Sequence, residues 1–343
     1  MRAQGVNQVP LCKAGGAART AAELQRRLCP PHLTLSQSMF AAAAASAAWQ
    51  RSELSAGRCN FQKIDAAALT DDTLLAVLRN ATEPTLVRGL LEAGSGHASA
   101  TRAGFLEAWG SHRVRVTRER EFVRTNQADS ITEGMELSEF AALLRAPRPA
   151  DDGALYMVHN LTHAEAERFR DGLPPRLRGA LAATLAAGLI GDSRVERLSL
   201  SGSRGGVFFH VHLALALNVV FAGRKRWFVF HGSDDVMPGS RNDPNWQKTV
   251  DEWLGSVYRT AEVQEAWRWR AYECTQHAGE VVAVPPLFAH AIYNLDETLA
   301  FVFQGLRGGW RPEFDNPTIV PPSQPLGDLD DDEPQTCEGE PAG

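Results

Sequence analysis

Three histidines in this 343-residue chain have the type and spacing to hold a metal ion. His210 and His212 lie two residues apart in a largely apolar run, and His290 lies far downstream in a second one. Side chains at i and i+2 of a β-strand point to the same face, so we expect the first two imidazoles to approach one ion together. A third histidine from another strand would complete a site that leaves coordination positions open, as catalytic metal sites do. Imidazole suits iron, zinc, copper and nickel.

The segments around these histidines are typical of short β-strands. Short strands without intervening helices favour an antiparallel barrel or double sheet. We therefore expect a mostly β protein with N-terminal helices. The predicted strands cover residues 195–200, 207–212, 217–221, 226–230, 280–284, 291–294 and 298–304.

The region before these strands has helix signals. Thr70 is placed to cap one helix, and Thr162 with Glu165 forms a capping box that opens another. The segment 231–272, between the two halves of the histidine pattern, reads as an insert that packs over one side of the barrel.

Composition sets limits on function. The content of 44% hydrophobic and 22% charged residues is that of a globular protein, and the net charge of -6 gives no reason to expect nucleic-acid binding. No apolar run approaches the roughly 20 residues that span a bilayer, so no transmembrane segment is predicted.

The five cysteines follow no metal-binding or redox spacing. Cys59 and Cys274 are the two that fall within the expected folded region. Either they form a bridge or they are two buried thiols, and the sequence leaves both readings open.

Both ends of the chain differ from its middle. Residues 1–57 are Ala-rich and acid-poor with several arginines, which is typical of an organelle transit peptide and equally of a disordered tail. Residues 321–343 are acidic and Pro-rich, and we expect disorder there.

Three segments together resemble a JmjC domain, a branch of the cupin superfamily. They are Phe209-His-Val-His212, the turn Gly223-Arg-Lys-Arg-Trp227, and the stretch from Cys274 through Gly279-Glu280 and His290 to Asp296. The resemblance implies a double-stranded β-helix (jelly-roll) core. On this basis we expect one JmjC/cupin-like domain over 58–320, with a helical lead-in over 58–193 and the core over 194–310.

Most JmjC enzymes are dioxygenases dependent on iron(II) and 2-oxoglutarate, with ligands in the order His-x-Asp/Glu…His. Here His212 stands at the carboxylate position. This departure makes the sequence most similar to the JmjC-domain-containing protein 8 group, whose members carry His-x-His. That resemblance implies the lumen of the endoplasmic reticulum, whereas the N-terminal composition implies organelle transit, and the compartment stays open.

The resemblance also assigns residues beyond the metal ligands. Lys225 occupies the place of the lysine that binds the distal carboxylate of 2-oxoglutarate, and its alternative reading is a solvated turn lysine. Asn218 and Tyr293 could add hydrogen bonds inside the barrel.

Two functions follow. The first is a metal-dependent oxygenase, with iron(II) or another divalent metal at His210, His212 and His290, acting on a protein or small-molecule substrate. The second is a non-catalytic JmjC-like binding or regulatory module with a degenerate or structural metal site, in which the paired histidines are core residues. Neither reading predicts an oligomeric state.

Overall fold

The computed structural model describes most of the expected folded region, and the predicted segments 1–57 and 321–343 lie outside it apart from Leu54 and Gly57. None of the described helices is long and apolar enough to cross a membrane. The described residues are 54, 57–91, 101–119, 133–145, 154–190, 193–212, 214–231 and 248–307.

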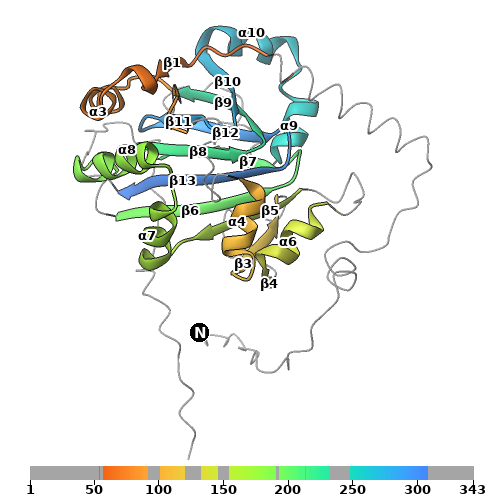
Figure 1. Cartoon of the computed structure of the whole chain (residues 1–343). Coiled ribbons are helices and arrows are strands. Elements are labelled where there is room, and N and C mark those ends of the chain that lie inside the picture. The colour runs from red at the N-terminus through yellow and green to blue at the C-terminus, as the bar shows by residue number, and fades with distance from the viewer. Residues whose placement is uncertain are drawn as a thin grey trace, which may run out of the picture. The chain divides into compact units, whose positions relative to one another are not determined.

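Two β-sheets dominate the fold (Figure 1). The larger has nine strands in the order β1-β2-β11-β8-β13-β6-β5-β3-β4, and the smaller has four in the order β10-β9-β12-β7. The strands are β1 (Gln62–Asp65), β2 (Thr85–Arg88), β3 (Arg113–Arg118), β4 (Glu133–Glu136), β5 (Leu155–Asn160), β6 (Ser193–Ser201), β7 (Gly206–His210), β8 (Ala216–Ala222), β9 (Arg224–His231), β10 (Ala271–His277), β11 (Val281–Val284), β12 (Phe288–Asn294) and β13 (Thr298–Arg307).

Within these sheets, the strands from β6 to β13 pair antiparallel. Successive strands change sheet at every step except β9 to β10, which are neighbours in the smaller sheet. This is the double-stranded β-helix of a cupin or JmjC core, and it confirms the predicted fold class. Strands of the lead-in extend the larger sheet at both of its edges, β1 and β2 at one edge and β5, β3 and β4 at the other.

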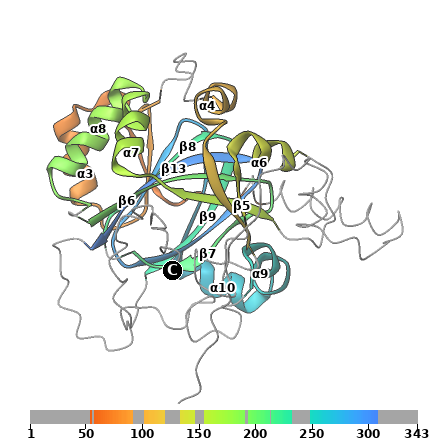
Figure 2. The same cartoon turned by 90° about the horizontal axis from the view of Figure 1, so that it is seen from below.

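Helices cover the outer face of the larger sheet, as Figures 1 and 2 show. Thr70 caps the first of them as predicted, by accepting a hydrogen bond from the Thr73 amide, and Thr162 with Glu165 forms the predicted capping box of α7. The helices of this layer are α3 (Asp71–Arg79), α4 (Arg102–Trp109), α6 (Leu137–Leu143), α7 (His163–Asp171) and α8 (Pro175–Ala186).

The outer face of the smaller sheet is covered by the predicted insert. Its helices α9 (Val250–Ser256) and α10 (Ala261–Arg270) bury Trp253 and Trp267 against Phe228 and Phe230 of β9. A third apolar cluster, which includes Trp227 and Val282, lies between the two sheets. Because successive residues of a strand point to opposite faces, the odd-numbered residues of β9 lie inside the barrel and the even-numbered ones lie outside.

Candidate functional site: a histidine cluster inside the barrel

His210 and His290 are direct neighbours on adjacent antiparallel strands of the smaller sheet, β7 and β12. Their ring centroids lie 4.2 Å apart. His212 lies 4.9 Å from His210 and 5.0 Å from His290, and a ligand atom of each ring falls within 4.8 Å of the other two. The structure therefore brings the three sequence-predicted histidines into one cluster.

A β-bulge turns His210 toward His290. Between the pairs His290–His210 and Ile292–Val207, strand β12 has one residue where β7 has two, Phe208 and Phe209. Both phenylalanines then pack on the outer cluster around Trp253, while His210 points to the interior. Bulges next to active sites re-aim side chains in this way.

The predicted strand 207–212 is too long, because β7 ends at His210 and His212 follows it in irregular chain. The expectation that both imidazoles share one face of a single strand is therefore wrong. His212 reaches the cluster from beyond the strand end, where the Leu287 amide donates a hydrogen bond to its carbonyl at 2.8 Å.

Backbone carbonyls orient two of the three rings. The Nδ1 atom of His210 lies 2.8 Å from the Phe208 carbonyl, and that of His290 lies 3.0 Å from the Phe288 carbonyl. A carbonyl only accepts, so each Nδ1 carries the hydrogen and each Nε2 keeps a free lone pair. Metal-binding histidines are oriented by such hydrogen bonds from their other nitrogen.

The cluster is uncharged at neutral pH. Burial lowers the pKa of His210 to about 4. Burial also holds the pKa values of His212 and His290 well below the ordinary histidine value, and repulsion from the neighbouring ring adds to it. Three neutral imidazoles with free lone pairs in a buried space are the donor set that iron(II), zinc or copper(II) prefers.

Lys225 lies inside the barrel on β9, between Asn294 of β12 and Gln276 of β10. It is 3% exposed, so it is not a solvated turn lysine. Among the described residues its side chain has no hydrogen-bond or ion-pair partner, and burial lowers its pKa to about 7. An uncompensated buried amine of this kind favours an anionic ligand.

Two unsatisfied amide oxygens belong to the same interior. The Oδ1 atoms of Asn218 and Asn294 are buried and lack a hydrogen-bond partner within the described part of the chain. Gln276, the cross-strand neighbour of Lys225, donates to the backbone carbonyl of Asn218 at 2.8 Å. Buried polar groups are seldom left unpaired, so this set marks a place where a polar ligand fits.

Tyr293 lies outside this interior. It belongs to the outward-facing residues of β12, packs with the cluster around Trp253, and donates its hydroxyl hydrogen to Asp251 at 2.9 Å. Its expected hydrogen bond inside the barrel is therefore wrong.

Arg197 on β6 is an interior cation that was not predicted from the sequence. Its positive charge contributes to the lowered pKa values of His210 and His212, which places it close to the cluster. Its Nε donates to Asn160 of β5 at 2.8 Å. The period-2 pattern of β6 could have found it, because Leu198 and Leu200 face the outer helices and Arg197 takes the opposite face.

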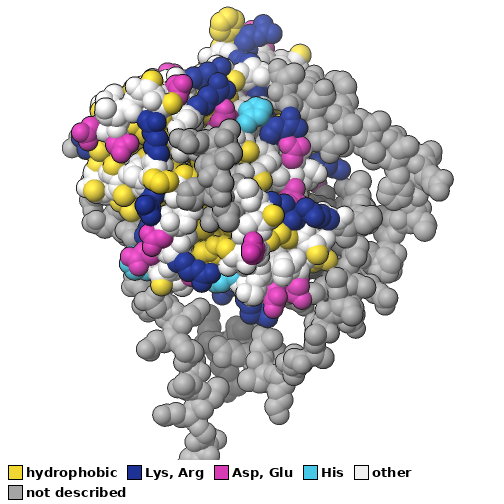
Figure 3. Space-filling model, viewed as in Figure 1, with side chains coloured by type: hydrophobic (Ala, Val, Ile, Leu, Met, Phe, Trp, Pro, Cys, Tyr) yellow, Lys and Arg dark blue, Asp and Glu magenta, His cyan; other side chains and the backbone are white. Residues whose placement is uncertain are grey.

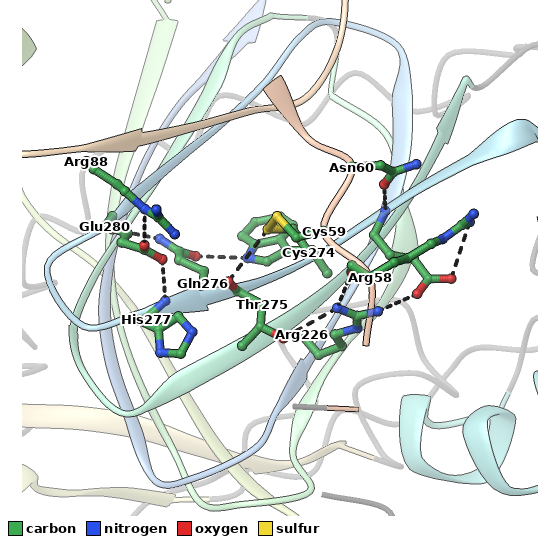
Figure 4. The surroundings of a disulfide bond; sticks show 12 residues. Arg58, Cys59, Asn60, Arg88, Arg226, Cys274, Thr275, Gln276, His277 and Glu280 are labelled. Carbon is green, nitrogen blue, oxygen red and sulfur yellow. Dashed lines mark hydrogen bonds and ion pairs between the residues drawn. A yellow bond between two sulfur atoms is a disulfide. The ribbon is translucent and has the colours of Figure 1, made fainter. Parts of the chain in front are cut away.

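A disulfide joins Cys59 to Cys274 of β10, which decides between the two readings left open by the sequence (Figure 4). Around it Asn60 exchanges hydrogen bonds with the Glu273 backbone, and Arg58 donates to the carbonyl of Trp267 at 2.6 Å. The start of the lead-in is thus fastened to the smaller sheet, whose β9 and β12 carry Lys225 and His290.

No family model matches the chain. Three relatives named JmjC domain-containing protein 8 match it, among them the mouse protein, 27% identical over 63% of this chain and 72% of its own length. The human protein is 27% identical over 63% of this chain and 73% of its own length. The protein named arginine-specific demethylase JMJ22 from Arabidopsis thaliana is 31% identical over 33% of this chain and 24% of its own length. Together with the double-stranded β-helix described above, these similarities support a JmjC domain of the cupin superfamily in this chain.

Proposed function

We propose that this protein is a JmjC-type metal-dependent oxygenase that uses iron(II), held by His210, His212 and His290, and 2-oxoglutarate. The observation that carries the proposal is the convergence of three neutral imidazoles in an interior that also contains a buried lysine with no partner among the described residues. Such a centre, when bound, couples the oxidative decarboxylation of 2-oxoglutarate by O2 to hydroxylation of a substrate C–H bond.

The role of the chain's own residues is to bind and orient the oxo acid. Lys225 would donate to its distal carboxylate, and that ion pair would offset the cost of burying the ammonium. Asn218 would add a hydrogen bond by donating from its side-chain amide nitrogen to an oxygen of the oxo acid. The positive charge of Arg197 also favours an anion in this interior.

We favour a protein side chain over a small molecule as the substrate. The support is the name of the Arabidopsis relative, an arginine-specific demethylase. Its match spans only 33% of this chain, so arginine itself is not proposed.

The second candidate function is a non-catalytic binding module with a structural metal. His212 favours it, because a neutral imidazole at the second ligand position leaves the metal's charge less compensated than the usual carboxylate would. In that case the barrel would bind a partner without turning over an oxo acid.

Turnover of 2-oxoglutarate distinguishes the two functions. The iron-loaded full chain should form succinate, and both His290→Ala and Lys225→Met should abolish this while His163→Ala, a change at an exposed helix residue, should not. Metal binding by the full chain without succinate formation, with or without a panel of protein substrates, would reject the oxygenase in favour of the module.

A further inference from the structure

A second group of metal-ligating side chains lies on the helix-covered face of the larger sheet. It consists of His112, which precedes β3, His159 of β5 and Glu165 in the first turn of α7. His159 points to the same side as Leu155 and Met157, which pack against the helices, and so away from the barrel interior. This group is therefore separate from the histidine cluster around His290.

The three side chains meet through their ligand atoms. The Nε2 atoms of His112 and His159 lie 2.9 Å apart. The Nε2 atom of His112 lies 3.0 Å from one carboxylate oxygen of Glu165, and that of His159 lies 3.6 Å from the other. All of these ligand atoms fall within 4.8 Å of one another.

Hydrogen bonds alone account poorly for this arrangement. If His112 Nε2 carries a hydrogen, it can donate to Glu165, but then its contact with His159 Nε2 needs that same hydrogen. If it carries none, it accepts from His159 and its lone pair faces a carboxylate oxygen 3.0 Å away. A cation at the centre satisfies all three groups at once.

The spacing suits a transition-metal ion. Tetrahedral zinc with ligands at about 2.0 Å holds those ligands about 3.3 Å apart. The separations of 2.9, 3.0 and 3.6 Å lie on both sides of that value. Two imidazoles and one carboxylate form a known zinc ligand set that leaves a position for water.

Local structure holds the ligands in place before a metal binds. Glu165 is fixed by the capping box, in which its carboxylate accepts from the Thr162 amide at 2.8 Å. The His112 ring packs edge-on to Trp109, with centroids 5.7 Å apart. The side chains of His112, His159 and Glu165 are 28%, 18% and 23% exposed, so an ion can reach them from solvent.

We propose that His112, His159 and Glu165 form a second, structural site for a divalent transition-metal ion of the zinc class, linking β3 and β5 to α7. The site does not depend on the proposed oxygenase function. Its binding should stabilise the contact between the larger sheet and the helix layer.

Zinc ion alone is the probe, and His210→Ala is the background that removes the barrel cluster. This variant of the full chain should retain about one equivalent of zinc after desalting and should melt at a higher temperature with zinc than without. Adding His159→Ala should remove both effects. Adding His163→Ala should change neither, because His163 pairs with Glu167 on α7 and belongs to no cluster of three metal-ligating side chains within the described residues.

Glu165→Gln keeps the side-chain oxygen that caps α7 and removes the anionic ligand, so it serves where His159→Ala fails to fold. It should weaken zinc binding by more than about tenfold, since even a hydrogen-bonding partner of a ligand changes affinity by about 10- to 100-fold. Cobalt(II) should give visible absorption bands of a tetrahedral ion in the His210→Ala background and lose them in Glu165→Gln. Equal zinc retention with and without His159→Ala would show that the three side chains form only a hydrogen-bonded group, and this would overturn the proposal.

Discussion

His290 of β12 pairs directly with His210 of β7, and this pairing exists because β7 contains one extra residue at Phe208–Phe209. In a regular ladder His210 would share its face with Phe208, which packs on the outer cluster. The bulge thus assigns both phenylalanines to the outer core and His210 to the interior.

Lys225→Met should stabilise the protein in the absence of any oxo acid. The pKa of Lys225 is lowered to about 7 by burial, so the unfolded state binds more protons between about pH 7 and 10.5. Wild-type stability should therefore rise over that range, by up to about 1.4 kcal/mol per pH unit from this group, and the variant should lack this rise. Guanidinium unfolding across that range measures it. If the free energies of unfolding of wild type and variant changed with pH in parallel, Lys225 would not be the buried amine described.

Glu119→Gln should remove a loss of stability that occurs as the pH rises, whereas Lys225→Met removes a gain. Glu119 is 1% exposed and accepts a hydrogen bond from the Val250 amide at 3.1 Å. Burial raises its pKa to about 8, and the nearby Asp251 and Glu252 add to this. The folded state therefore stays protonated up to a higher pH than the unfolded state, and stability is lost as the pH rises from about 4.5 to about 8.

Glutamine keeps the acceptor for Val250 without this titration, so the variant should be less sensitive to pH over that range. Urea unfolding of both proteins at pH 5 and pH 8 is the measurement. A stability difference between wild type and variant that is the same at both pH values would contradict a buried, protonated Glu119.

Removing the disulfide with Cys59→Ser and Cys274→Ser should lower the free energy of unfolding by about 2–5 kcal/mol. The bond closes a loop of 215 residues in sequence separation, so the unfolded chain gains much freedom when it is lost. Thermal melts with and without reductant are the test. The reductant should lower the melting temperature of wild type to that of the double variant and leave the variant unchanged.

The sequence predicted those features of the fold that depend on local pattern. Alternating apolar residues located most core strands, and Thr70 and Thr162 marked helix starts that the structure confirms. Strand β10 (Ala271–His277) was not predicted, because its mixture of Glu273, Thr275 and Gln276 lacks a simple period. Those polar groups are buried in contacts with β9 and with the backbone of Asn218, and only the folded structure shows these contacts.

The sequence predicted which residues form the candidate site better than it predicted how they are arranged. The three histidines meet, but no local signal revealed the bulge or the end of β7 before His212. The burial of Lys225 depends on the opposing sheet, and so does the approach of Arg197 to the histidines. Basic and acidic side chains are interspersed over the described surface visible in Figure 3, so surface charge on that face does not point to the site.

Whether the histidine cluster holds a metal is tested by the iron content of untagged protein loaded anaerobically with iron(II), compared between wild type and His210→Ala. The variant should lose about one equivalent of iron relative to wild type, while His163→Ala should lose none. Equal iron in wild type and His210→Ala would show that the histidine cluster holds no metal and would contradict the oxygenase proposal.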